Sequence, residues 1–370
     1  MEKSSNKNEV NNRKISNLII KFYYLFSILI FCSLTFSGCD PCCCNNNPKR
    51  QNIIYFSTMP VNATEPVIYS MKPDGSGFSA IVQNGIIYSA PSNQMLTFIR
   101  EKQQNQNVIL VALDDGTKQK QIIPDNYFKQ IKSPVLSPDT IWVAFSDLDR
   151  KLNLARTDGN VGTPISNNFC RNSIPAFSPN GKWIAFYEGQ NIKGPLTIKV
   201  FNTEVPEDNI IAFEKKYNYG ININKCDANI EWSSDGQYIL YSFQESDSVD
   251  LIYFTNVFTK EENIFKINDL GIISPILAPD NFRLAFIDKD GNLWLRNLSH
   301  TNPGYQKLTN IDSISYNLYP QWSKDGKYIV YTQYYTDDAK DFRGILKIID
   351  VETKRTSVLC NNVYKAFWSR

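Results

Sequence analysis

Apolar residues along this chain fall in short runs separated by turn residues, and the clearest run follows the turn Ser178–Gly181, Ser-Pro-Asn-Gly. Proline presets φ for the first central position of a turn, and glycine accepts the positive φ that closes a tight hairpin. In the next segment, Trp-Ile-Ala-Phe at 183–186, alternation places Trp and Ala on one face and Ile and Phe on the other. Both faces of this predicted strand are apolar, so other layers must cover both.

The same turn and strand recur along the chain, and an aromatic residue closes each copy of the strand. These aromatic markers are Phe56, Phe98, Phe145, Phe186, Tyr241, Phe286 and Tyr331. The intervals between them are 42, 47, 41, 55, 45 and 45 residues. A period near 45 residues, with short strands and no helical pattern of useful length, is typical of propeller blades. Seven markers predict seven blades within residues 51–370.

Each repeat contains further strands around the marker strand. A short strand precedes the turn, as in 230–232, and two more follow the marker, as in 196–201 and 209–213. A unit of four antiparallel strands cannot cover its own two apolar faces, so the units must stack around an axis. Small residues on the second strand fit the taper toward that axis: Ala144, Ala185 and Ala285.

The two ends of the repeat region complement each other. Residues 52–56 read as a second strand with no first strand before it, and 363–369 read as a first strand with nothing after it. Joined, they complete one blade and remove the open edges that invite aggregation. We therefore expect an all-β fold, a seven-bladed β-propeller of four-stranded antiparallel blades that is closed by the C-terminal strand joining the N-terminal blade.

The repeats resemble the TolB-type, WD40-like propeller repeat, whose consensus is an aromatic residue, Ser-Pro-Asp-Gly and then Ile-Ala-Phe. The turns that carry the resemblance are Ser137-Pro138-Asp139, Ser178-Pro179-Asn180-Gly181, Ser233-Ser234-Asp235-Gly236, Ala278-Pro279-Asp280-Asn281 and Ser323-Lys324-Asp325-Gly326, with a decayed copy at Ala90-Pro91-Ser92-Asn93. The resemblance covers residues 51–370. The family includes a periplasmic protein that binds a peptidoglycan-associated lipoprotein, sensor domains and the propellers of prolyl peptidases, so the resemblance implies a fold rather than one activity.

The first 38 residues predict a sorting signal. Residues 1–21 are mostly polar and net basic, and 22–36 form an apolar run of about 15 residues, which is short for a transmembrane helix. The run ends in Phe-Ser-Gly before Cys39, which resembles the lipobox of bacterial lipoproteins. We expect a signal peptide at 1–38, a lipid on Cys39 and a flexible tether at 39–50. An uncleaved anchor helix at about 18–36 is the alternative.

Charge excludes one class of partner. The chain has 39 basic and 37 acidic residues, and its first 38 positions hold five and two of them, which leaves 34 basic and 35 acidic residues. This balance offers no electrostatic footprint for nucleic acid. We expect a monomer in the cell envelope, facing the periplasm or the cell exterior, with a membrane contact through the N-terminal lipid.

Candidate chemistry is sparse. The single histidine, His300, lies in a polar turn, and no Gly-x-Ser-x-Gly elbow supplies a nucleophile. The segment 288–292, Asp-Lys-Asp-Gly-Asn, resembles the start of a calcium loop but lacks the distal glutamate, so we predict a strand-joining turn. The adjacent cysteines 42–44 lack metal-site spacing. No catalytic residue, metal or cofactor is predicted.

Two functions stay open. The first is a surface-anchored binding or scaffold module for an envelope protein or glycan, and the second is a propeller enzyme acting on glycans or peptides at the channel mouth. An acidic pair roughly 5 to 10 Å apart at that mouth favours glycan hydrolysis. Aromatic and neutral polar residues there favour binding.

Loop length varies on one face of the predicted disc. Loops joining strands one to two and three to four open on what we call the first face, and the remaining loops open on the second face. The longest loops, 214–227 and 333–344, both belong to the second face, which points to recognition there, with drift in unselected loops as the alternative. The binding-surface candidates are Tyr217, Tyr219, Tyr334, Tyr335, Phe342 and Arg343. A disulfide between Cys170 and Cys226 would brace this face.

Overall fold

The computed structural model describes residues 52–60, 63–102, 106–125, 131–160, 162–170, 173–190, 195–208, 210–218, 229–246, 248–298, 304–335 and 344–369. All of these residues lie in one unit, Arg50–Arg370. The unit consists of β-strands, with a single 3-10 turn at Pro206–Asp208 as the only helical element in the described ranges. Within those ranges, no helix has the length and apolar character needed to cross a membrane.

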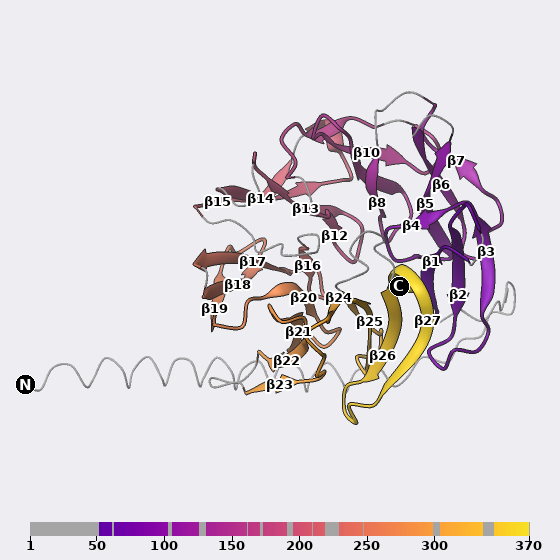
Figure 1. Ribbon diagram of the computed structural model, residues 1–370. Coiled ribbons are helices and arrows are strands. Elements are labelled where there is room, and N and C mark those ends of the chain that lie inside the picture. Colours follow the sequence, from indigo (N-terminus) through magenta and orange to yellow (C-terminus); the bar gives the residue numbers. More distant parts are fainter. Residues whose placement is uncertain are drawn as a thin grey trace, which may run out of the picture. The chain divides into compact units, whose positions relative to one another are not determined.

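Five sheets contain four antiparallel strands each, in chain order (Figure 1). The first two are β4 (Ile86–Ile87), β5 (Met95–Lys102), β6 (Gln106–Leu113) and β7 (Lys120–Gln121), and β8 (Lys132–Leu136), β9 (Trp142–Ser146), β10 (Leu152–Arg156) and β11 (Pro164–Ser166). The third is β12 (Ala176–Phe177), β13 (Trp183–Glu188), β14 (Leu196–Asn202) and β15 (Ile211–Tyr217). The fourth and fifth are β16 (Glu231–Trp232), β17 (Tyr238–Ser246), β18 (Val249–Asn256) and β19 (Glu262–Asn268), and β20 (Ile273–Leu277), β21 (Arg283–Ile287), β22 (Leu293–Asn297) and β23 (Tyr305–Lys307).

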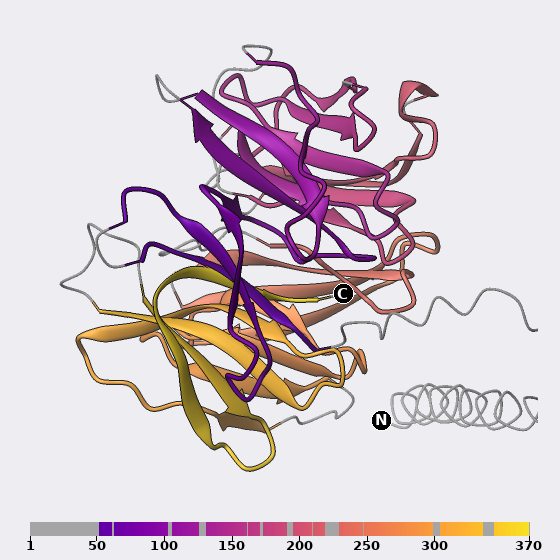
Figure 2. The same cartoon turned by 90° about the vertical axis from the view of Figure 1, so that its right-hand side faces the viewer.

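A sixth sheet has seven strands and contains both ends of the described chain. Its order is β24 (Ser315–Trp322), β25 (Tyr328–Tyr335), β26 (Gly344–Asp350), β27 (Thr356–Trp368), β1 (Ile54–Thr58), β2 (Val67–Met71) and β3 (Ser79–Gln83). The 13-residue strand β27 belongs to two groups of strands. Its first half pairs with β26, from Thr356 opposite Ile349, and its second half pairs with β1, up to Trp368 opposite Ile54. Figure 2 shows this yellow strand passing beside the indigo β1.

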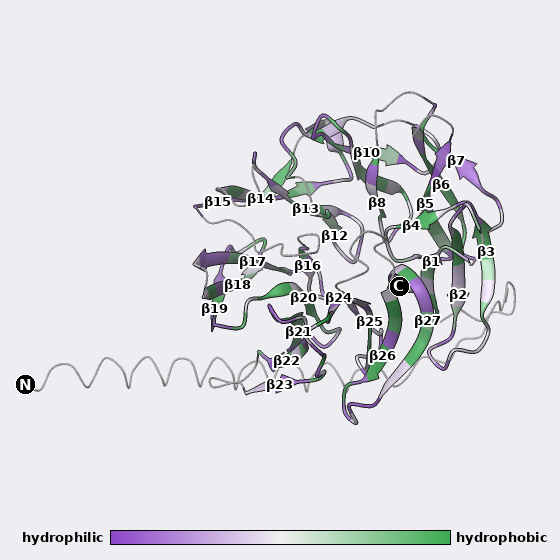
Figure 3. Ribbon diagram, in the orientation of Figure 1, coloured by the Kyte–Doolittle hydropathy of each residue, from purple (hydrophilic) through white to green (hydrophobic). Residues whose placement is uncertain are grey.

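Hydrophobic clusters fill the spaces between successive sheets. Seven clusters occur among the described residues, and each combines side chains from two neighbouring groups of strands. One of them joins Phe56 and Met71 of the N-terminal strands to Val330 and Leu346 of the C-terminal strands. In Figure 3 the inner strands β4 and β20 are green, whereas β7, at an outer edge, is purple.

The aromatic markers identified in the sequence lie on the second strand of each group. Every one of them is at most 3% exposed. The alanines predicted to fit the taper, at 144, 185 and 285, are fully buried on β9, β13 and β21. First strands of successive sheets lie side by side, as β16 does with β20 and β20 with β24, so the second strands are covered on both faces.

The repeated turn is stabilised by its own serine and acid. In the turn before β13, the Ser178 hydroxyl donates to Asn180 and accepts the Trp183 N–H at 3.0 Å, and Gly181 has φ of +75°. The same arrangement joins Ser137 to Asp139 before β9. Because a Cβ on Gly181 would lie 2.4 Å from Asp139 Oδ2, neighbouring turns also pack against each other.

Three first strands bulge at the same place. Each bulge contains a residue with positive φ directly before a proline, four positions before the turn: Ser133 (φ 47°), Ser274 (φ 48°) and Tyr319 (φ 54°). A positive φ is uncommon outside glycine, above all for a bulky residue. Lys365 of β27 occupies the equivalent position before Ser369, and its Nζ lies 4.1 Å from the ring centroid of Tyr319. Tyr319 and Lys365 therefore lie next to each other.

Candidate functional site

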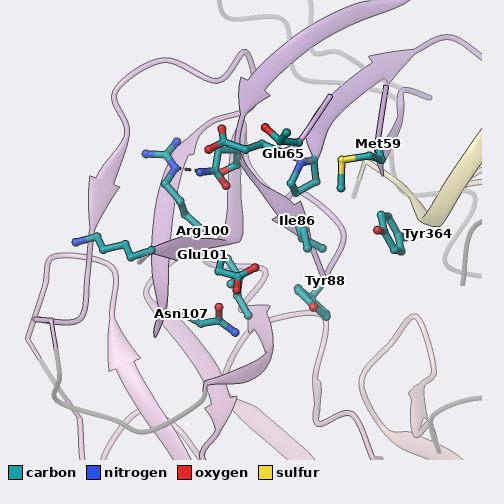
Figure 4. Close-up of a pocket in the computed structure, with 13 residues that line it drawn as sticks. Met59, Glu65, Ile86, Tyr88, Arg100, Glu101, Asn107 and Tyr364 are labelled. Atoms are coloured by element: carbon teal, nitrogen blue, oxygen red, sulfur yellow. Dashed lines mark hydrogen bonds between the residues drawn. The ribbon is translucent and has the colours of Figure 1, made fainter. Parts of the chain in front are cut away.

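A pocket of about 980 Å³ opens where the N-terminal strands meet the sheet β4–β7. Its lining comes from the β1–β2 loop, the connection from β3 to β4, the β5–β6 hairpin and β27, all of which belong to the second face. The lining residues used below are Met59, Glu65, Asn84, Ile86, Tyr88, Arg100, Glu101, Lys102 and Tyr364. In Figure 4, Ile86 and Tyr88 lie in the middle, with Met59 and Tyr364 on one side and Arg100 on the other.

Strand alternation separates the charges of the pocket. On β5, Arg100 and Lys102 point to one face of the sheet and Glu101 to the other, because successive side chains alternate. Arg100 and Glu101 lie where β5 ends, opposite Val108 and Asn107 of β6. The β5–β6 hairpin thus presents acidic and basic groups to different neighbours.

The two basic side chains of the pocket are engaged by the protein itself. Arg100 donates from Nε to the Asn84 carbonyl at 3.0 Å, and from Nη2 to Gln83 at 3.2 Å and Gln119 at 2.7 Å (Figure 4). Lys102 forms an ion pair with Asp125 at 2.7 Å and also donates to Gln121 at 3.1 Å. Arg100 therefore holds the end of β3 and the residue before β7, and Lys102 holds β7 and the segment after it.

The two carboxylates of the pocket are not engaged in this way. Glu65 and Glu101 are exposed, and neither forms an ion pair or a side-chain hydrogen bond within the part of the chain that the structure describes. Beyond Arg100 and Lys102, the neighbouring segments add no counter-charge, because residues 61–62 are Val-Asn and 103–106 are Gln-Gln-Asn-Gln. With Lys102 neutralised by Asp125, the formal charge of the pocket is negative.

Tyrosines connect the pocket to the blade-like group β24–β27. The Tyr334 hydroxyl donates to the main-chain oxygen of Tyr364, whose ring lines the pocket. Tyr334 in turn stacks on Tyr316, with ring centroids 5.7 Å apart, and makes an edge contact with Tyr319 at 6.4 Å. The predicted residue Tyr334 is thus a buried support of the pocket wall.

The structure corrects two of the predicted surface residues. Tyr334 is 3% exposed inside β25, and Tyr217 is 5% exposed at the end of β15. Both strands continue further than the sequence suggests, so these side chains enter the clusters between sheets instead of a loop surface. Tyr335, the next residue, points the other way and is 36% exposed, as expected for a surface residue.

Tyr217 belongs to a polar cluster within a hydrophobic core. Its hydroxyl lies 2.6 Å from that of Tyr241 and donates to Glu262 at 2.8 Å, while Lys215 pairs with the same carboxylate. Burial, followed by Tyr241, raises the pKa of Tyr217. Burial alone would raise the pKa of Glu262, but hydrogen bonds from Lys215 and Tyr217 lower it overall. The cluster clamps β15 to β17 and β19 and serves packing.

Several predicted residues lie outside the described residues. They are Tyr219, Phe342, Arg343, Cys226, His300 and the lipidation site Cys39. Cys170, the other half of the predicted disulfide, is 1% exposed, and burial raises the pKa of its thiol to about 11. The pairing with Cys226 stays a prediction.

The calcium-like segment is a hairpin turn between β21 and β22, as predicted. Asp288 accepts the Asn292 N–H at 2.7 Å and the Trp294 indole N–H at 2.6 Å. Its carboxylate is therefore part of the turn. No group of three or more metal-ligating side chains occurs among the described residues.

The pocket residues themselves escaped the sequence analysis. Met59 and Glu65 lie in a loop of ordinary length, and Tyr364 was read only as part of the closing strand. The available signal was topological: pairing β27 with β1 brings the second-face loop 59–66 next to Tyr364. Loop length alone pointed to the face on which this pocket opens, but to other loops.

No protein-family model matches the chain, and no curated protein matches it in sequence. Among solved structures, it is similar to a candidate 6-phosphogluconolactonase from Bacteroides fragilis at 11% identity and a TM-score of 0.56, covering 90% of this chain and 100% of the other. A candidate 6-phosphogluconolactonase from Bacteroides uniformis matches at 11% identity and a TM-score of 0.54, covering 85% and 98%. TolB from Acinetobacter baumannii matches at 14% identity and a TM-score of 0.46, covering 86% and 83%.

At these identities the likeness concerns the fold, not the chemistry. The recurring Ser-Pro-Asp-Gly turn, the aromatic markers on the second strands and the sheets placed around an axis all agree with it. The described strands form an all-β fold of antiparallel sheets placed around an axis, which is the arrangement of a β-propeller.

Proposed function

We propose that this chain is a non-catalytic binding module of the bacterial cell envelope, which uses the second-face pocket to hold a protein or glycan partner. The pocket carries the proposal, because it combines about 980 Å³ of space with a methionine, two tyrosines and two exposed carboxylates on a rigid scaffold. Tyrosine and methionine are enriched where proteins bind partners.

The pocket also supports binding over hydrolysis. A glycosidase needs a carboxylic acid whose proton is retained by an apolar or like-charged environment. Glu65 and Glu101 are both exposed, so the surrounding protein does little to desolvate either carboxylate. The equivalent first-strand positions Ser133, Ser274, Tyr319 and Lys365 include no carboxylate.

The module is proposed to be a seven-bladed ring that is closed by β27 and held at a membrane by a lipid on Cys39. Seven interfacial clusters and the double pairing of β27 support the blade count and the closure. The apolar run before Cys39 supports the anchor. In this arrangement the propeller acts as a monomer, facing the periplasm or the cell exterior.

The test is capture of envelope partners by the full-length protein in detergent extracts. Replacing Met59 and Tyr364 by alanine should lower capture at least tenfold, because both side chains line the pocket while the Tyr364 main-chain oxygen stays in place for Tyr334. The matched control is Phe282→Ala, which removes a 59% exposed aromatic ring from the first face. Equal capture by the pocket variant, with an unchanged melting temperature, would reject the pocket as the binding site.

The enzyme alternative is favoured by one observation, the presence of two carboxylates in one pocket. It requires that purified protein release products from peptidoglycan fragments or other oligosaccharides. Under this alternative, Glu101→Gln abolishes turnover while fragments still bind. Binding without product release by the wild type supports the module.

A further inference from the structure

We propose that the second-face pocket accepts a basic side chain, lysine or arginine, that a peptide segment of the partner inserts. This inference rests on the proposed binding function and names its ligand class. It starts from a difference between the charged groups of the pocket. The cations have partners among the described residues, and the carboxylates have none there.

The two cations of the pocket already have partners within the protein. Arg100 uses Nε and Nη2 on two main-chain oxygens and the Gln119 side chain, and its guanidinium carbon lies 5.5 Å from the Phe98 ring centroid. Lys102 already holds Asp125 at 2.7 Å. A cationic guest leaves all of these contacts intact.

The anions are available to a cation. Glu65 comes from the β1–β2 loop and Glu101 from the end of β5, so the carboxylates approach the pocket from two different groups of strands. Neither carboxylate is satisfied by a described neighbour. A cationic group bound by either carboxylate would gain charge-assisted hydrogen bonds, which are stronger than neutral ones.

The rest of the lining suits the stem of such a side chain. Met59, Ile86 and Tyr364 provide an apolar wall, and long basic side chains bury their methylene stems against such walls. Tyrosine faces also attract cations. The chain uses this contact next to the pocket, where Lys365 lies 4.1 Å from the Tyr319 ring centroid.

A peptide fits the pocket better than a small amine. The space of about 980 Å³ exceeds one side chain, and Asn84 and Asn107 add amide groups that can hydrogen-bond a main chain. Tyr335 continues the second face beyond the pocket on β25 and is exposed. The expected guest is a short segment with a basic residue at its centre and apolar atoms on either side.

Titration calorimetry with matched probes tests the ligand class. The probe is acetyl-Ala-Ala-Lys-Ala-Ala-amide, and the comparison peptides carry norleucine or glutamate instead of lysine. The full-length protein should bind the lysine peptide at least tenfold more tightly than either comparison peptide. Raising the salt concentration should weaken this binding, because screening reduces the attraction between exposed charges. Equal binding of the lysine and norleucine peptides would overturn the inference.

Charge-neutralising variants locate the effect. The double variant Glu65→Gln, Glu101→Gln should bind the lysine peptide at least tenfold more weakly than the wild type does. The control combines Glu261→Gln and Glu352→Gln, two exposed carboxylates in first-face hairpins, and should leave the affinity unchanged. Equal losses in both double variants would mean that overall charge, not the pocket, attracts the peptide, and would reject the proposal.

Two further outcomes separate this inference from the function on which it rests. If n-butylamine binds as tightly as the peptide, the assignment to a peptide is wrong. If the Met59 and Tyr364 variant loses envelope capture while the glutamine variant keeps it and shows no lysine preference, the ligand class is wrong and the binding function stands. If capture survives in the Met59 and Tyr364 variant, the binding function itself fails.

Discussion

At the scale of single residues, the repeated turn shows how much chemistry a short motif contains. The sequence predicts the turn and the need for glycine in it. It does not predict that the acid of one turn contacts the glycine of the next, as Asp139 does with Gly181. That contact depends on the angle between sheets, which no local pattern specifies.

Replacing Gly181 by alanine should destabilise the propeller by about 1 to 3 kcal/mol. The φ of +75° is strained for alanine, and the new Cβ would lie 2.4 Å from Asp139 Oδ2. Asp139 cannot move freely, because it accepts hydrogen bonds from Ser137 at 2.5 Å and Ile141 at 3.0 Å. Urea denaturation measures the change. Gly304→Ala, which meets nothing within 4 Å, is the control and should leave stability almost unchanged.

The buried carboxylate of Asp250 should make the protein less stable as pH rises. Asp250 is 2% exposed; its Oδ2 accepts the Ile272 N–H at 2.8 Å, and its Oδ1 has no hydrogen-bond partner among the described residues. Burial raises its pKa to about 6, against an ordinary value of 3.8. The folded state therefore binds the Asp250 proton more tightly than the unfolded state does. The stabilisation of the folded protein by this proton is complete below pH 3.8 and is lost as pH rises through 6.

Asp250→Asn should remove that pH dependence. A shift of two pKa units corresponds to about 3 kcal/mol, so the variant should gain up to about that amount relative to wild type between pH 4 and pH 7.5. Urea denaturation at a series of pH values measures the difference between the two proteins. A difference that stays constant across this range would show that Asp250 does not titrate as its burial requires.

At the scale of elements, the interior of a strand is easier to predict from the sequence than the residue at which the strand ends. The pattern of markers places the second strands correctly, because both faces of those strands are apolar. It misplaces Tyr217 and Tyr334, because tyrosine is compatible with an exposed loop and with a core that satisfies its hydroxyl. Tyr241 and Glu262 are the hydrogen-bond partners of the Tyr217 hydroxyl, and the Tyr364 main-chain oxygen is the partner of the Tyr334 hydroxyl. All three partners are distant in sequence from the tyrosine that they bind.

Strand β27 should be the element on which the stability of the whole propeller depends. Trp368 is 5% exposed, lies in the cluster shared by the two chain ends and donates its indole N–H to Gln321 at 3.1 Å. Trp368→Ala should therefore cost about 3 to 5 kcal/mol, as large-to-small core changes do. Val358→Ala, on the same strand but 59% exposed, is the control and should cost little.

Removing more of the strand should have a larger effect. A chain ending at Cys360 loses Val363, Ala366, Phe367 and Trp368, each at most 9% exposed, and exposes the edge of β1. A folded protein has a total stability of only about 5 to 15 kcal/mol. The shortened chain should therefore not be stably folded at ordinary temperature and should show no cooperative unfolding transition. A shortened chain that melts like the full chain would contradict closure by β27.

At the scale of the whole molecule, the sequence predicts the architecture well and the site poorly. Architecture follows from a repeated pattern, so each copy supports the others. The pocket follows from one junction, where the loop 59–66 meets Tyr364 at the opposite end of the chain. The charge that the pocket offers to a ligand depends on which side chains already have partners within the protein. Arg100 and Lys102 meet their partners only in the folded sheet.

The final prediction concerns where the whole molecule resides. If Cys39 is lipidated, the protein should fractionate with membranes, because two or more acyl chains hold a protein firmly whereas one binds only marginally. The observation behind this expectation is the apolar run 22–36, which ends in Ser-Gly directly before the cysteine. Intact-mass analysis of the membrane fraction should find a chain that begins at Cys39 and carries the added acyl mass.

Cys39→Ser is the decisive variant, since it removes the acyl acceptor and keeps the rest of the signal. It should yield either a soluble chain or an unprocessed one with residues 1–38 still attached. Cys360→Ser, at a partly buried position on β27, is the matched control and should keep both the acyl mass and the membrane fractionation. A Cys39→Ser protein that still fractionates with membranes at the cleaved, acylated mass would show that another residue carries the lipid. The uncleaved anchor would be supported instead if the wild type itself retains residues 1–38, because an apolar helix at 18–36 then replaces the lipid as the membrane contact.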